Sequence, residues 1–196
     1  MGLMKFIRNV LAMLGLAVLV GGGYLAFKAW PIVAEFDPDA VKIYTDFAAK
    51  LLETKDPGQA MMWTVPVEDD SLTPEDVKDA LKSLATARNF LFVAESRFSE
   101  AVEAKTGKSY RHISFMSFCD ARVGKMMADY RDAYTGFMPC RIAVVEDIQG
   151  KLWLYSMNLD MLIHGGRMLP PELRKEATRI RNVLREIMEG AAAGEF

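Results

Sequence analysis

The sequence lacks the short motifs that mark the common enzyme classes. No P-loop, GxGxxG fingerprint, Ser-His-Asp order or paired-carboxylate motif can be assigned in its 196 residues. It holds two histidines, His112 and His164, and neither lies at a metal-ligand spacing such as HxxxH, so we expect both at the surface or in capping positions. The sequence therefore predicts no catalytic residue, no cofactor and no metal site of a common kind.

An excess of positive charge is also missing. The 24 basic residues are outnumbered by 26 acidic ones, which gives a net charge of −2. Lys5, Arg8 and Lys28 are the charged residues of the first thirty, and removing these three positive charges leaves −5 for the rest of the chain. Nucleic-acid binding needs clustered Lys and Arg to neutralise phosphates. We therefore exclude nucleic acid as a partner.

Cysteine is scarce, because Cys119 and Cys140 are the only two. They flank a helix expected between two strands, so we expect both at one end of the sheet. An oxidising compartment would permit a disulfide. Two buried free thiols are the second possibility, and a redox, sulfur-carrying or metal-binding role is the third. That third role needs a stabilised thiolate, for which Arg122, Lys125, Arg141 and the helix start after Cys119 are available. The spacing of the cysteines matches no CxxC motif, which weakens the reactive hypothesis.

Methionine, by contrast, is abundant, with thirteen residues. Met61-Met62 and Met126-Met127 are adjacent pairs, and soft thioethers are ligands that Cu(I) accepts. Adjacent residues point in different directions on a strand or a helix. The pattern therefore favours core filling over a metal site.

One long uncharged run lies near the start of the chain. Residues 9–27 carry no charge, and nineteen residues at about 1.5 Å each span roughly 28 Å, close to the hydrocarbon thickness of a bilayer. Lys5 and Arg8 precede the run, while Tyr24 and Trp30 lie at its far end, where amphipathic rings favour the membrane interface. We expect one transmembrane helix, with the lipid bilayer as its partner.

The flanking charges predict the orientation of this helix. Two basic residues and the amino terminus precede it and Lys28 alone follows, so the N-terminus should stay cytoplasmic and the rest should face outward. A cleaved signal peptide is the alternative, but its apolar part is usually 7 to 15 residues and no Ala-x-Ala site follows here. Gly21, Gly22 and Gly23 would allow close approach of another helix in the membrane, and a flexible exit from the helix is the equal alternative.

Helical and strand patterns alternate in the rest of the chain. Pro31 should break the first helix, and Asp37-Pro38 should cap a second one to about Glu53, which we expect to pack on the domain. Residues 55–58 show turn chemistry, and Thr73 with Asp76 resembles a capping box. The expected strands are 61–67, 90–96, 112–118 and a hairpin of 141–147 with 151–157, and the expected helices are 73–88, 99–107, 121–130 and 171–189.

The last expected helix has one strongly basic face. It carries Arg174, Lys175, Arg179, Arg181 and Arg185. We expect this face to be solvated, and the alternative is contact with acidic lipid or a protein partner.

Residues 136–166 resemble the C-terminal signature of the DUF302 family of bacterial and archaeal domains of unknown function. In that signature a Leu-Pro pair leads into an apolar strand, an acidic turn with glycine and a second strand with aromatic residues. Residues 72–84 and 96–107 resemble the first two helices of the family. The places in the signature are filled by Met138-Pro139, Arg141 to Val145, Glu146-Asp147, Gly150 and Lys151 to Tyr155.

The resemblance spans residues 61–166 and implies a fold. It implies an α+β domain in which a curved antiparallel sheet packs against helices, similar to the TATA-binding-protein-like arrangement, and members commonly form dimers. Many members have Gly-Asn-Pro after the middle strand, where this chain has Ser117 to Asp120, so it is closer to a subgroup with cysteine there and in a Pro-Cys pair. We expect the divisions 1–30 for the anchor, 31–58 for a connecting amphipathic helix, 59–168 for the family domain and 169–196 for a C-terminal helix and tail.

These observations together favour a non-enzymatic interaction domain. We expect a single-pass protein of the bacterial inner membrane with a periplasmic domain, acting as an accessory or assembly subunit of a respiratory or sulfur-metabolising complex. Its expected partners are other subunits or a second copy of itself. Thiol-based redox or sulfur transfer at Cys119 and Cys140 is the alternative, and metal or haem binding is a third hypothesis.

Overall fold

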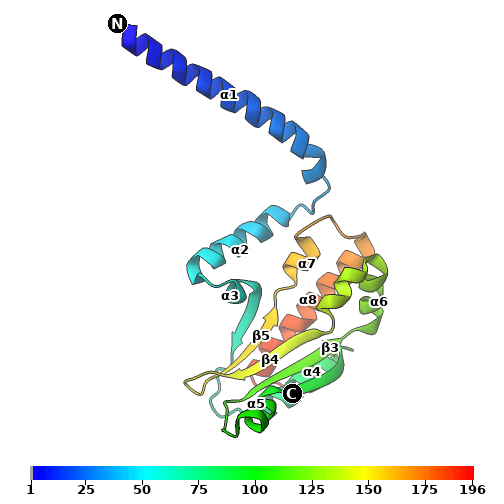
Figure 1. Cartoon of the computed structure of the whole chain (residues 1–196). Helices are drawn as coiled ribbons and strands as arrows, with labels where there is room; N and C mark the ends of the chain where they lie inside the picture. The colour runs from blue at the N-terminus through cyan, green and yellow to red at the C-terminus, as the bar shows by residue number, and fades with distance from the viewer. Residues whose placement is uncertain (1) are drawn as a thin grey trace.

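A long apolar helix precedes an α+β domain in the computed structural model, which describes residues 2–196 (Figure 1). Helix α1 (Gly2–Val33) extends away from the rest of the chain. The expectation that Pro31 breaks this helix is wrong, because Pro31 lies in its last turn. Proline removes one helical donor, but the Ala34 N–H donates to the Trp30 carbonyl at 2.8 Å and closes that turn.

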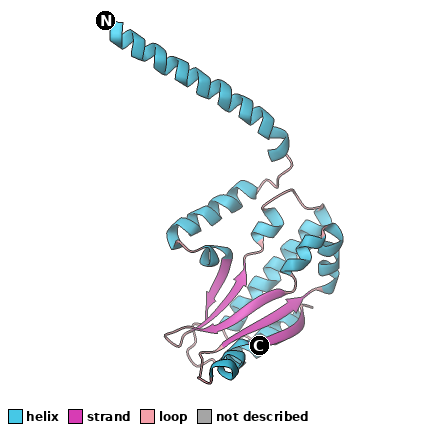
Figure 2. Cartoon of the chain, in the orientation of Figure 1, coloured by secondary structure: helices cyan, strands magenta, loops and turns pink. Residues whose placement is uncertain are grey.

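The domain is built on one antiparallel sheet (Figure 2). Its strand order is β1-β5-β4-β3-β2, so the hairpin of β4 and β5 lies at the centre beside β3. The predicted α+β class is confirmed, and so is each expected strand within one or two residues. The bounds are β1 (Met62–Pro66), β2 (Leu91–Arg97), β3 (Ile113–Cys119), β4 (Cys140–Glu146) and β5 (Leu152–Met157).

Two helices, α4 (Pro74–Ala87) and α8 (Pro171–Ala192), cover one face of this sheet and also pack on each other. The predicted capping box is present at the start of α4, where Thr73 and Asp76 exchange hydrogen bonds. Alternate residues of the strands face the helices and form the core. The largest fully buried side chains are Phe90, Phe118, Leu81, Met116, Ile142, Leu154, Leu184, Ile187 and Met188.

The opposite face of the sheet is only partly covered. Helix α5 (Phe98–Thr106) packs on β3, where the Phe98 and Phe115 rings lie 5.8 Å apart. Beyond α5 the face carries half-buried aromatic side chains, with Trp153 and Tyr155 stacked at 6.4 Å. The sheet therefore has one closed face and one largely open face.

The connecting helix α2 (Ala40–Thr54) packs less deeply than expected. Ala40 is its one buried residue, and its contacts are with α3 (Pro57–Met61) and α7 (Asp160–His164) rather than with the main core. The helix also begins two residues later than predicted, because Asp37 caps the turn before it by accepting the Asp39 N–H at 2.9 Å.

The remaining elements gather at the end of the sheet nearest α1 (Figure 1). Helix α6 (Ala121–Tyr130) follows β3 as predicted, and a short 3₁₀ helix, η1 (Asp132–Phe137), leads on to β4. Helices α3 and α7 and η1 were not predicted. Each has five or six residues, which is too short to show a helical repeat of apolar positions.

Candidate functional site

Cys119 and Cys140 come together at one end of the sheet. Cys119 ends β3 and Cys140 begins β4, and the register pairs Phe118 with Cys140, so the cysteines are diagonal neighbours. The expectation that they share one end of the sheet is therefore confirmed. Both are free thiols in the structure, and the disulfide weighed above is not formed.

Burial raises the pKa of both thiols. The pKa of Cys140 rises to about 11, first because the thiol is withdrawn from water and then because charge on Cys119 would repel its thiolate. Burial, followed by the adjacent Asp120 carboxylate, raises the pKa of Cys119. Thiols with raised pKa values are protonated at neutral pH and are therefore weak nucleophiles. This environment disfavours disulfide exchange and sulfur transfer by the pair.

The groups expected to stabilise a thiolate are engaged elsewhere. The start of α6 is capped by Asp120, whose carboxylate accepts the N–H groups of Arg122 and Val123 at 3.0 and 3.1 Å. The three expected cations each contact another side chain. Arg122 donates to Glu176 at 2.6 Å, Lys125 pairs with Asp129, and Arg141 lies over the Phe115 ring at 5.7 Å.

A small apolar cavity of about 70 Å³ lies beside the two cysteines. Its wall comes from the ends of β3 and β4 and from helices α6, α7 and α8, together with the segments between them. Cys119, Cys140, Met127 and Met138 all line it, so four sulfur-bearing side chains face one space. This concentration of sulfur was not expected, because Met127 and Met138 lie on separate segments of the chain.

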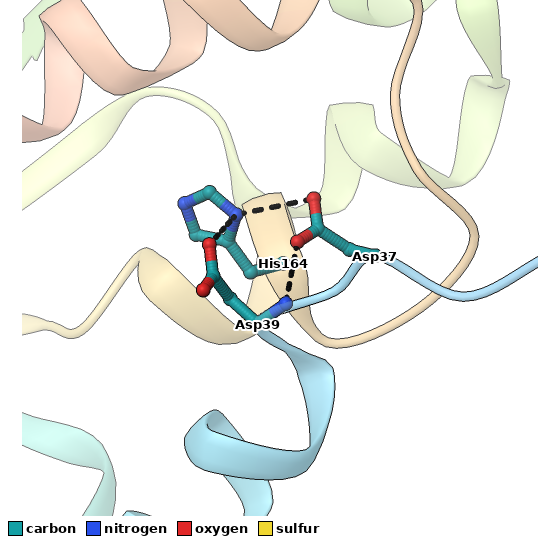
Figure 3. A group of neighbouring side chains, drawn as sticks. All are labelled: Asp37, Asp39 and His164. Carbon is teal, nitrogen blue, oxygen red and sulfur yellow. Dashed lines mark hydrogen bonds and ion pairs between the residues drawn. The ribbon is translucent and has the colours of Figure 1, made fainter.

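A second cluster joins the segment between α1 and α2 to the domain, and Figure 3 shows three of its residues, Asp37, Asp39 and His164. Asp37, between α1 and α2, has a fully buried side chain. Its Oδ2 lies 3.2 Å from His164 Nδ1, at the end of α7, and 3.1 Å from an Arg174 guanidinium nitrogen on α8. Arg174 also reaches Asp39 at 3.3 Å. We call Asp37, Asp39, His164 and Arg174 the connector clamp.

Backbone contacts reinforce the connector clamp. The Asp37 N–H donates to the Gly166 carbonyl at 2.8 Å, and the Met168 N–H donates to the Glu35 carbonyl at 3.3 Å. The Tyr44 hydroxyl on α2 donates to the Gly165 carbonyl at 2.7 Å. The segment that follows α1 is therefore fixed to the loop between α7 and α8.

The connector clamp contains atoms that metals accept, but an arginine already contacts its carboxylates. Asp37, Asp39 and His164 each offer one ligand atom, and these atoms lie within 4.8 Å of one another. The Arg174 guanidinium contacts both carboxylates and supplies the positive charge that a cation would bring. The geometry therefore supports a structural role, in which the connector clamp holds the segment between α1 and α2 against the domain.

We expected both histidines at the surface or in capping positions, and neither side chain lies at the surface. The His164 side chain is 12% exposed because it packs against Asp37. His112 is half-buried, its ring contacts Ser114 Oγ at 3.1 Å, and burial together with the Lys78 charge lowers its pKa. Sequence separation explains why the clamp was missed, since Asp37 and His164 are 127 residues apart.

Replacing Asp37 by alanine should lower the free energy of unfolding by about 1.5–3 kcal/mol, the usual contribution of a buried hydrogen bond to a charged group. Urea unfolding of the full chain in detergent, followed by circular dichroism, measures the change. Asp46→Ala is the matched control, because Asp46 pairs only with exposed Lys42 and its loss should change stability by about 0.5 kcal/mol or less. Equal effects of both substitutions would contradict a stabilising clamp.

The basic face of α8 is largely neutralised by ion pairs within the chain. These pairs remove the free positive charge that binding to acidic lipid would need. Arg174 pairs with Asp37 and Asp39, Arg179 with Asp120 and Glu176, Arg181 with Asp160, and Arg185 with Glu189.

Gly21, Gly22 and Gly23 lie within α1, with no atom of the chain close to them. A Cβ added at any of the three would meet nothing within 4 Å outside its own helix segment. Consecutive residues on a helix point about 100° apart, so the three glycines do not form a single stripe.

The fold and the domain sequence agree with one known family. The family model for the domain of unknown function DUF302 matches residues 63–191, about two thirds of the chain, and the chain belongs to this family. The match extends past residue 168, where we expected the domain to end, and takes in α8. The expected resemblance is confirmed.

Among solved structures, the chain is similar to a crystal structure of an uncharacterised conserved DUF302 protein from Bacillus stearothermophilus. The identity is 17%, the TM-score is 0.55, and the likeness covers 66% of this chain and 96% of that one. At this identity the comparison shows the fold alone. No curated protein matches the chain.

Proposed function

We propose that this chain is a single-pass protein of the bacterial inner membrane whose DUF302 domain faces the periplasm and binds another subunit of a membrane complex. Within residues 2–196, α1 is the one helix long and apolar enough to cross a membrane, and none of its apolar window is buried. The class of complex that we propose is respiratory or sulfur-metabolising. The proposed role is accessory or assembly, without catalysis by this chain.

The observation that carries the proposal is an exposed apolar stripe on α2. Val41 and Leu52 are 71% and 78% exposed, and Thr45 and Ala48 lie exposed between them. These four residues are spaced by four, three and four positions, so they share one side of the helix. We call them the α2 stripe. The opposite side of α2 rests on α3 and α7, so the stripe has no partner within the described chain.

The position of the α2 stripe favours a partner in the same membrane. Six residues separate the end of α1 from the start of α2, and the connector clamp fixes this link to the domain. A subunit anchored in the same bilayer would meet the stripe at a high effective concentration.

Charge favours a protein over the lipid surface at this position. The exposed polar residues of α2 are of both signs, and Lys42 pairs with Asp46 on the same helix. Interfacial helices usually have a polar face rich in Lys and Arg, which α2 lacks. The α2 stripe therefore suits contact with a second polypeptide whose surface is partly apolar and partly polar.

The proposal predicts that the chain with α1 intact remains in the membrane and retains a polypeptide partner in mild detergent. Replacing both Val41 and Leu52 by serine should weaken retention of that partner by about tenfold or more, because burying each such side chain contributes about 1.5–3 kcal/mol. Native purification at normal expression level, followed by mass spectrometry of the chain and its partners, measures both results.

Ile148→Ser is the matched control, because Ile148 is 85% exposed at the tip of the β4–β5 hairpin and lies far from α2 in sequence. It should retain the partner fully. Three results would each overturn the proposal: a mature chain that lacks α1, a chain that migrates alone in detergent, or equal losses in the stripe variant and the control.

A further inference from the structure

The cavity beside the two cysteines has an unusual lining. Its volume of about 70 Å³ is several times what one water needs, yet the wall is almost entirely apolar. Asp120 is the one carboxylate on this wall, and it already accepts two backbone N–H groups and an Arg179 donor. Tyr134 also lines the cavity, and its hydroxyl donates to the Leu162 carbonyl at 3.5 Å. The other side-chain groups that can contact a ligand are the sulfur atoms of two cysteines and two methionines.

Glycine at position 124 opens the space between two of these sulfurs. A Cβ added at Gly124, on α6, would lie 3.3 Å from Met138 Sδ and 3.4 Å from Cys119 Sγ. One point on the cavity wall is therefore in contact with both a thioether and a thiol. Cys140 begins β4 two residues after Met138 and lines the same space.

We propose that this cavity binds one monovalent soft cation of the Cu(I) class, held by Cys119, Cys140 and Met138, with Met127 as a further thioether. On binding, each cysteine that becomes a ligand loses its thiol proton to solvent, and a sulfur–metal bond replaces the sulfur–hydrogen bond. No electron is transferred. The site is independent of the anchor and of any protein partner.

The chemistry of the lining selects this class of ion. Thiolate and thioether sulfur favour soft Cu(I), whereas Mg²⁺ and Ca²⁺ need oxygen ligands. Zn²⁺ sites use thiolate, imidazole and carboxylate, and the cavity offers no imidazole and no free carboxylate among its described lining residues.

The flexibility of methionine makes the site adaptable. Its side chain has three rotatable bonds, so Met138 and Met127 can each adjust their sulfur position without moving the backbone. The cysteines lie on β3 and β4 at the end of the sheet, where Cys119 pairs with Leu91 of β2 and Cys140 pairs with Phe118 of β3. The result is two fixed sulfur ligands with two adjustable ones.

Titration of the full chain in detergent with Cu(I), under oxygen-free reducing conditions and against a competing Cu(I) chelator, tests the proposal. We expect one Cu(I) per chain and an X-ray absorption spectrum with sulfur neighbours only. Met138→Leu should weaken binding by more than about tenfold, since loss of even a supporting group around a metal lowers affinity by 10–100-fold. Cys119→Ser and Cys140→Ser should each weaken it further.

Met168→Leu is the matched control, because Met168 is 49% exposed in the loop between α7 and α8 and does not line the cavity. It should bind Cu(I) as the unaltered chain does. Leucine conserves the volume of methionine, so both leucine variants should fold. Their difference in Cu(I) affinity therefore tests the role of Met138 even if a serine variant fails to fold. No competition for Cu(I), equal affinity of both leucine variants, or Zn²⁺ bound as tightly as Cu(I) would overturn the proposal.

Discussion

Replacing Phe118 by alanine should lower the free energy of unfolding by about 3–5 kcal/mol. Phe118 lies on β3, between β2 and β4, and is fully buried. Its ring is stacked with Phe90 at 5.9 Å and tilted against Phe92 at 5.6 Å. The substitution removes apolar burial and both ring contacts, and it leaves a cavity that the strands on either side prevent from collapsing. Domains of this size are stable by about 5–15 kcal/mol, so the loss is a large fraction of the total.

Urea unfolding of the full chain in detergent, followed by tryptophan fluorescence and circular dichroism, measures this loss. Phe98→Ala is the matched control, because Phe98 is 40% exposed on α5 and contacts Phe115 on the open side of the sheet. It should lower stability by about 1.5 kcal/mol or less. Equal losses at the two positions would show that the core does not lie on the side of the sheet covered by α4 and α8.

The strands and the long helices could be predicted from local patterns. In β5, Leu152, Leu154 and Ser156 are buried while Trp153 and Tyr155 are half-buried, which is the alternation visible in the sequence. The Thr73 capping box marked the start of α4 to the residue. Such features depend on neighbours within four residues, so one segment of sequence contains the whole signal.

The connector clamp could not be predicted in this way. Besides the local Asp39 N–H, the Asp37 carboxylate contacts His164 and Arg174, more than a hundred positions away, and no local pattern specifies such a pairing. The same holds for α2. Its apolar spacing indicates a side that packs on the domain, but the structure leaves Val41 and Leu52 exposed while Phe47 and Leu51 are half-buried. Amphipathic spacing predicts a helix, but it does not say which of two apolar sides is covered.

The chemistry of the cysteines was predicted in part. Their order along β3 and β4 brought them together as expected, because antiparallel neighbours share an end of the sheet. Sequence proximity to Arg122 and Arg141 was a poor guide to electrostatics, since both side chains point to other partners. The proximity of Met138 and Cys119 at Gly124 depends on the packing of α6 and had no sequence signal.

Replacing Lys78 by methionine should lower the free energy of unfolding by about 3 kcal/mol at pH 7, the usual effect of removing one partner of a buried ion pair. Lys78, on α4, is 2% exposed, and its ammonium lies 2.8 Å from Glu95 on β2 and 2.6 Å from Glu75. Glu75 is exposed, so water replaces the contact that its carboxylate loses with Lys78. The Glu95 side chain is 14% exposed, and the positive charges that remain near it are Arg97, at 3.7 Å, and the more distant Lys82.

The pH dependence distinguishes this ion pair from simple packing. The hydrogen bond from Lys78 holds the pKa of Glu95 below its ordinary value. A lowered folded-state pKa gives stability that is fully present above the unfolded value, about 4.3, and is lost as pH falls through the folded-state pKa. In the methionine variant this contribution is absent, so the stability difference between the two proteins should shrink as pH falls from 5 toward 3.

Urea unfolding at several pH values measures this difference. Lys42→Met is the matched control, because Lys42 pairs with Asp46 at an exposed site and its replacement should change stability by about 0.5 kcal/mol or less. Adding Glu95→Leu to the Lys78 variant should restore most of the lost stability, since an apolar pair of similar volume avoids the unpaired buried carboxylate. A difference that stays constant from pH 7 to pH 3, together with no restoration in the double variant, would mean that Lys78 acts through the packing of its aliphatic chain rather than through its charge.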